Sequence, residues 1–152
     1  MDISQILRFI RHTVEDGGEE FMATMFVESG VNGPDGIVQL DRFPKEAWPQ
    51  VMQAVATKLN APQYVFVSES WAAMLPPDSP LMARLLKGKI RVSELPPDDR
   101  TEILNMLIVP RFGEHEMRMA KIKRLPSGKR VIEPWEIFRG AKRFESRLVV
   151  KW

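Results

Sequence analysis

The chain has 152 residues, of which 44% are hydrophobic and 28% charged, with 22 Lys and Arg against 20 Asp and Glu. This composition is typical of a single globular domain spanning 1–152, and it argues against a largely disordered chain. The sequence contains no cysteine, which excludes disulfides, thiolate chemistry and cysteine-ligated zinc or iron–sulfur centres. Because it also has only two histidines, we expect no metal site and no cofactor.

The charges are distributed unevenly along the chain. Residues 1–110 carry 10 Lys and Arg against 15 Asp and Glu, whereas 111–152 carry 12 against 5. An acidic body is thus followed by a basic C-terminal region, a pattern that indicates which partners a surface attracts. The acidic body could also pair with the basic region of the same or a neighbouring subunit, so a homo-oligomer is one of our expectations.

The sequence shows no targeting or membrane signal. Arg8 and Arg11 interrupt the apolar N-terminal segment, no small-residue cleavage site follows, and no stretch of about 18 consecutive apolar residues occurs. We therefore expect a cytoplasmic protein that does not engage a membrane.

The first half of the chain predicts two helices and three strands. Apolar residues at helical spacing predict an amphipathic helix over 3–16, and β-prone residues 21–27 and 37–40 flank turn residues, which predicts a hairpin. A second helix is expected from Pro44 or Pro49 to Leu59. The strand at 64–71 starts with four apolar residues without alternation, which is typical of a central strand covered on both faces, or on one face and part of the other.

The second half predicts a long connection followed by strands. Proline pairs mark 76–100 as a connection with a short helix at 81–87, and a loop of this length is uncommon unless functional, so a lid is an open alternative. Strands are expected at 102–109, 115–124, 131–132 and, from alternating apolar residues, 144–152. For 134–139 both helix and strand remain open.

This order of elements lacks regular βαβ repeats. It predicts an α+β fold with a mainly antiparallel β-sheet and two amphipathic helices packed on one face.

Candidate catalytic residues are few. Glu69 ends the expected central strand, where side chains emerge from the core, and is the first choice for a functional carboxylate. In the segment around His115, a carboxylate could orient the imidazole, but on a strand His115 points away from Glu114 and Glu116. We interpret this segment as an exposed turn, with His115 and Arg111 kept as candidate partners of Glu69.

The basic C-terminal region contains the candidate binding residues. Lysines and arginines alternate there with apolar and aromatic positions, which indicates the outer face of a folded sheet and a surface for acidic ligands, nucleic acid included. The binding candidates are Arg118, Lys121, Lys123, Arg124, Lys129, Arg130, Lys142 and Arg143.

The strand ending Ser68-Glu69-Ser70-Trp71, followed by the segment 96–104 that contains Pro-Asp-Asp-Arg, resembles small uncharacterised bacterial and phage proteins of unknown role. The likeness covers about 45 residues and implies cytosolic single-domain proteins without assigning a catalytic residue. We expect Arg100, within this segment, to lie near the end of the central strand and to pair with Glu69.

Three functional hypotheses follow. The first is a non-enzymatic accessory protein that binds a protein partner or another acidic surface through its charged face. The second is nucleic-acid binding through the sheet face of 111–152. The third is a carboxylate-based enzyme that uses Glu69 with Arg100, Arg111 or His115.

Overall fold

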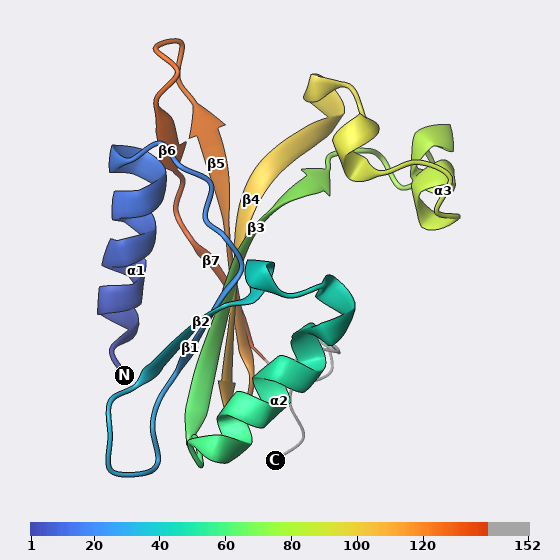
Figure 1. Cartoon of the computed structure of the whole chain (residues 1–152). Coiled ribbons are helices and arrows are strands. Elements are labelled where there is room, and N and C mark those ends of the chain that lie inside the picture. Colours follow the sequence, from blue (N-terminus) through green and yellow to red (C-terminus); the bar gives the residue numbers. More distant parts are fainter. Residues whose placement is uncertain (140–152) are drawn as a thin grey trace.

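One antiparallel sheet forms the centre of the molecule. A computed structural model describes residues 1–139 (Figure 1). The strands follow the order β2-β1-β3-β4-β5-β6, β7 also pairs with β5, and every pairing is antiparallel. The strands are β1 (Thr24–Val27), β2 (Gly36–Gln39), β3 (Gln63–Ala73), β4 (Arg100–Pro110), β5 (Glu116–Arg124), β6 (Arg130–Ile132) and β7 (Glu136–Arg139). The predicted α+β class and antiparallel sheet are confirmed.

Three α-helices and five shorter helical turns accompany the sheet in the described part of the chain. The α-helices are α1 (Ile3–Arg11), α2 (Trp48–Lys58) and α3 (Pro80–Leu86). The turns are η1 (His12–Asp16), η2 (Leu40–Arg42), η3 (Lys45–Ala47), η4 (Val92–Glu94) and η5 (Pro97–Asp99). None of the helices within 1–139 has the length and apolar character to cross a bilayer.

The two main helices begin where the sequence predicts. Asp2 caps α1 by accepting a hydrogen bond from the Ser4 N–H at 2.8 Å. Ile6 and Ile10 of α1 form a buried stripe that Val14 of η1 continues. The last five residues of the predicted helix form the wider π-helical turn η1. In α2, proline occupies the first turn, where it sacrifices no helical hydrogen bond.

The central and C-terminal strands also follow the prediction. β3 and β4 are paired over eleven residues each, and β3 lies between β1 and β4, as expected for a central strand. The segment 134–139, which the sequence left open, contains β7, because its backbone completes the outer edge of β5 beside β6. The strand predicted at 144–152 lies outside the described residues.

The prediction that both helices pack on one face is wrong, because α1 and α2 cover opposite faces of the sheet (Figure 1). Tyr64 and Phe66 belong to the core cluster under α2, whereas the alternating Val65 and Val67 belong to the cluster under α1. We call these sides the α2 face and the α1 face. A strand that is apolar without alternation has two faces to bury, so each face of the sheet is covered by its own helix.

Candidate functional site

Four charged side chains from four adjacent strands form a charge cluster on the α1 face. It consists of Glu69 on β3, Glu102 on β4, Arg124 on β5 and Arg130 on β6. The register pairs Glu69 with Leu104, Glu102 with Ile122 and Arg124 with Arg130. Since side chains alternate along a strand, this register turns all four to the same face.

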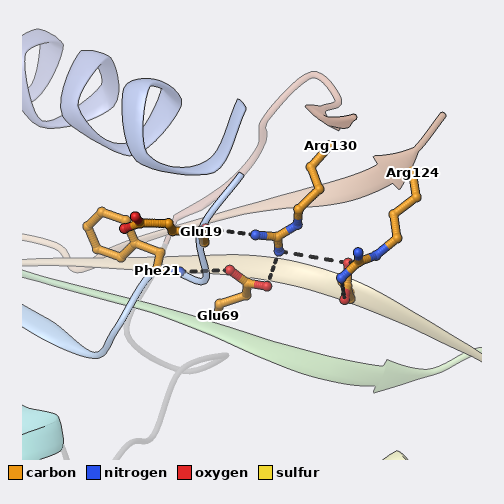
Figure 2. Close-up of polar contacts among 6 residues, drawn as sticks. Glu19, Phe21, Glu69, Arg124 and Arg130 are labelled. Atoms are coloured by element: carbon orange, nitrogen blue, oxygen red, sulfur yellow. Dashed lines mark hydrogen bonds and ion pairs between the residues drawn. The ribbon is translucent and has the colours of Figure 1, made fainter. Parts of the chain in front are cut away.

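The cluster extends from a buried ion pair to a pair that joins the buried Glu102 to the exposed Arg124 (Figure 2). Arg130 contacts the Glu69 carboxylate through Nη2 and Oε1, with side-chain exposures of 4% and 7%, and its Nη2 lies 3.8 Å from Oε2 of Glu102. Arg124 donates to both oxygens of Glu102, at 2.7 and 3.2 Å. Arg124 is itself 60% exposed, so the second pair lies at the solvent boundary.

The buried pair also fixes the chain segment that connects η1 to β1. Arg130 Nη1 donates to the Glu19 carbonyl oxygen at 2.8 Å, and the Phe21 N–H donates to Oε2 of Glu69 at 2.9 Å (Figure 2). The Phe21 N–H thus bonds a side chain in place of a sheet partner. This accounts for the start of β1 at Thr24, three residues after the predicted start.

Burial and pairing shift the protonation equilibria of these groups. Burial raises the pKa of Glu69 above its ordinary value, and this effect outweighs the Phe21 N–H and the Arg130 guanidinium, which both lower it. The hydrogen bonds and charge of Glu102 raise the pKa of Arg124. Arg130 retains one buried guanidinium atom, Nε, without a hydrogen-bond partner in the described residues.

The expected pairing of Glu69 with Arg100 is wrong. Arg100 lies over the Trp71 ring, with 4.4 Å between its Cζ and the ring centroid, and contacts the Ser93 carbonyl oxygen. Trp71 is two residues beyond Glu69, so Arg100 pairs with β3 nearer the strand end. Arg130, which lies 61 positions from Glu69 in the chain, takes the place expected for Arg100.

The other catalytic candidates are not brought to Glu69. Arg111 follows β4 at the end opposite Arg100, roughly 35 Å away along eleven extended residues, and donates to Asn60 Oδ1 at 2.9 Å. His115 is half-buried in the connection between β4 and β5, at the same end as Arg111. The four candidates therefore do not form one site.

The basic residues of the C-terminal region separate by sheet face. Arg118, Arg124 and Arg130 point to the α1 face and each contacts a carboxylate; Arg118 pairs with Glu116, which also binds Arg139. Lys121 and Lys123 point to the α2 face, are exposed, and have no ion pair within the described residues. Lys129, in the β5–β6 turn, is exposed too, and Lys142 and Arg143 lie outside the described residues.

The half of the α2 face that lies beyond α2 carries polar side chains. We call it the open face. Its polar residues are Ser68, Ser70, Asn105, Lys121 and Lys123, and Ile103 and Met119 lie among them. Asn105 Nδ2 donates to Ser70 Oγ at 2.8 Å across β3 and β4. Among the strands β3 to β7, the single acidic side chain on this face within 1–139 is Glu136, at the sheet edge opposite Met119.

A cleft of about 350 Å³ adjoins the open face, with Ser68 and Ser70 in its lining. Its walls come from the segment before β1 and from the η2–α2 region, and they include Phe43, Lys45 and Trp48. Three acidic residues, Glu20, Asp41 and Glu69, also line it. Trp48 donates through Nε1 to the Phe43 carbonyl oxygen at 3.1 Å, and Lys45 Nζ lies 5.9 Å from the Trp48 ring centroid. Phe43 remains 42% exposed, so an aromatic ring is available at the cleft.

No group of three or more His, Cys, Asp or Glu side chains within 1–139 could hold a metal ion.

Sequence reasoning counted Arg130 among surface cations. It expected the side chains of 68–71 to enter a crevice, and Ser68, Glu69 and Ser70 do line the cleft, but it did not identify the opposite wall. One signal was present for Arg130, because Arg124 and Arg130 flank the Pro-Ser-Gly turn symmetrically and must share a face in the hairpin. The cleft joins residues far apart in the chain, so no local pattern marks its opposite wall.

Comparisons of the chain with protein-family models, curated proteins and solved structures give no match.

Proposed function

We propose that this protein is a non-enzymatic binding protein that holds an acidic macromolecule against the open face. The observation behind this proposal is the separation of the basic residues by face. Of the C-terminal basic residues, Arg118, Arg124 and Arg130 on the α1 face each contact a carboxylate, whereas Lys121 and Lys123 are exposed without an ion pair in the described residues. Uncompensated charge of one sign attracts a partner of the other sign.

The state of Glu69 supports a binding role over a catalytic one. Its oxygens are occupied by Arg130 and by the Phe21 N–H, and its side chain is 7% exposed. A general acid or base must reach the proton that it transfers. Here the carboxylate is instead used to hold the chain segment before β1.

Within this proposal we favour single-stranded nucleic acid, with its phosphates on Lys121 and Lys123 and a base at the rim of the cleft, because the acidic lining residues Glu20, Asp41 and Glu69 would repel a phosphate inside it. Ser70, Ile103 and Lys121 are neighbours across three strands, so Lys121 lies roughly 10 Å from the cleft lining. A single strand offers phosphates to lysines and unstacked bases to exposed aromatic rings. Phe43 provides such a ring in the cleft.

Fluorescence anisotropy with labelled 20-nucleotide oligo(dT) and oligo(U), a 20-base-pair duplex, and polyglutamate as competitor tests the proposal. We expect the oligonucleotide to bind more weakly as the salt concentration rises. In the double variant Lys121→Gln/Lys123→Gln, the slope of log K against log[salt] should decrease in magnitude by about 1.4, because each phosphate contact on a single strand contributes about 0.7. The matched control is Lys87→Gln/Lys89→Gln, two exposed lysines with the same spacing beside α3.

Each result has a definite meaning. Oligonucleotide binding that only the first double variant weakens supports nucleic acid on the open face. Binding of polyglutamate but not of oligonucleotides points to an acidic protein. If the wild-type protein binds none of these polymers, or both double variants behave alike, the proposal is wrong.

A further inference from the structure

We infer that β2 is a docking edge for an extended segment of a protein partner, which adds to the sheet as a further strand. This surface lies at the opposite end of the strand order from Lys121 and does not depend on the function proposed above. The inference combines the backbone of β2, an adjoining apolar groove and the charge at its rim.

The backbone of β2 offers hydrogen-bonding groups at the sheet edge. The Leu40 N–H donates to the Ala23 carbonyl oxygen at 2.8 Å, and these residues continue the register of β1 with β2. The C=O of Gln39 accepts the first hydrogen bond of η2, of which Gln39 is the N-cap. Bonded and non-bonded pairs alternate in an antiparallel ladder, so Val38 and Gly36 bond to β1, while both backbone groups of Ile37 and the N–H of Gln39 point outward. No described residue bonds these outward groups.

The side chains of β2 lack the usual protection of an edge. Such edges are commonly blocked by lysine, proline or inward-pointing charge, but β2 reads Gly-Ile-Val-Gln. Ile37 is 68% exposed on the α1 face, and Phe9 of α1 is 49% exposed. An apolar surface therefore lies directly beside free backbone groups.

A groove of about 290 Å³ runs between α1 and β2, and its lining includes Ile6, Phe9, Phe26 and Ile37. An added strand would place alternate side chains on the α1 face, next to Ile37. Apolar side chains at these positions would fill the groove. This is the pairing mode in which backbone bonds supply affinity and pockets for alternate residues supply specificity.

The rim of the groove indicates the charge of the partner. Asp2 and Asp35 both line the groove, and the Asp35 side chain is 48% exposed. The N-terminal ammonium of Met1 lies 3.7 Å from a Glu28 carboxylate oxygen and 3.8 Å from an Asp35 carboxylate oxygen. Two carboxylates thus lie within 4 Å of one ammonium group, and a third, that of Asp2, lines the same groove. The occupant that fits is an extended protein segment in which apolar residues alternate and basic residues flank them.

A displayed library of random 12-residue peptides, selected on the wild-type protein, tests this inference. We expect enriched sequences with alternating apolar residues and basic flanks. A synthetic peptide of the enriched sequence should slow hydrogen exchange at the amides of Ile37 and Gln39.

The sharpest variant is Gln39→Pro. Gln39 has φ −82°, close to the proline value, and its N–H points outward, so proline removes one docking donor without breaking the ladder to β1. Binding of the synthetic peptide should weaken about tenfold, the equivalent of one lost hydrogen bond. Gln39→Ala should bind like the wild type, and Ile37→Lys should bind weakly, whereas the control Ile137→Lys, which changes a similarly exposed residue of β7, should have no effect.

Other outcomes overturn the inference. The inference is wrong if the library yields no consensus sequence. It is also wrong if the selected peptide binds Gln39→Pro and Ile37→Lys as tightly as it binds the wild type. A dimer of the protein alone that Gln39→Pro dissociates would assign the edge to a second copy of this chain and not to a partner segment.

Discussion

At the residue scale, Arg130 shows how position changes the meaning of a charge. In the sequence it is one of twelve basic residues after position 110, whereas in the structure its side chain is 4% exposed and contacts Glu69. A buried arginine must be compensated by carboxylates and carbonyl oxygens. Arg130 therefore holds β3, β6 and the segment before β1 together, and it is unavailable to a ligand.

We predict that Arg130→Met lowers the free energy of unfolding by about 3 kcal/mol at pH 7, because it leaves Glu69 buried without its nearest cation. Burial already raises the pKa of Glu69, and the loss of a cation that lowers it raises it further. The penalty should therefore shrink as pH falls, since Glu69 then binds a proton in the folded state. Urea unfolding at several pH values measures both effects.

Two further variants distinguish this account from a general loss of packing. Glu69→Gln added to Arg130→Met should recover part of the lost stability, because it removes the uncompensated charge. Arg124→Met, which removes the 60% exposed arginine and leaves the buried Glu102 with Arg130 Nη2 at 3.8 Å, should cost less than Arg130→Met. Equal losses for Arg124→Met and Arg130→Met at every pH would contradict the prediction.

At the element scale, β5 organises the C-terminal part of the sheet. One edge of β5 pairs with β4, and the other edge is shared by the short strands β6 and β7. Glu116 reinforces the β7 end, since it binds Arg139 of β7 at 2.9 Å and Arg118 of its own strand at 3.0 Å. A four-residue strand such as β7 gains part of its attachment from this ion network.

The network gives a pH-dependent prediction for Glu116. Burial alone would raise its pKa, but the hydrogen bonds of Arg139 and Arg118 together lower it below the ordinary 4.5. A lowered pKa contributes stability above the unfolded value, and that contribution is lost as pH falls through the folded value. Glu116→Gln should thus reduce stability by about 1 kcal/mol at pH 7, with a difference from wild type that vanishes in acid.

Chemical denaturation between pH 3 and pH 7, together with hydrogen exchange of the β7 amides, measures this effect. The control is Glu136→Gln, which changes an exposed carboxylate of β7 that has no ion pair within the described residues. A loss that persists unchanged at pH 3 would show that Glu116 acts through packing and not through its charge.

The sequence predicts elements well here, and their contacts only in part. Helix α1, the hairpin, α2 and the central strand are predicted because local periodicity and turn residues determine them. The partner of Glu69 is not predicted, because its contact with Arg130 depends on the registers of three strand pairs, which no local sequence pattern determines. The opposite placement of the helices was encoded in the unbroken apolar run of 64–67, which has two faces to cover.

At the scale of the whole molecule, two separate core clusters share one sheet. Ile10 belongs to the cluster under α1, and Met52 belongs to the cluster under α2, and both are fully buried. β3 and β4 contribute alternate residues to both clusters, so neither can form without the strands that also support the other. We therefore expect a single cooperative unfolding transition, although the core is divided.

This expectation is tested by substitutions that shorten one buried side chain in each core cluster. Met52→Ala should cost about 3 kcal/mol and Ile10→Val about 1 kcal/mol, and far-UV circular dichroism and tryptophan fluorescence should report one transition in each variant. Because Ile10 and Met52 lie in different clusters, their effects should add within about 0.5 kcal/mol. The combined effect of Ile10→Val and Val65→Ala, two residues of one cluster, should deviate more from the sum of the single effects. Two transitions, or coupling between Ile10 and Met52 as large as that between Ile10 and Val65, would mean that the sheet does not separate the two cores as the strand alternation implies.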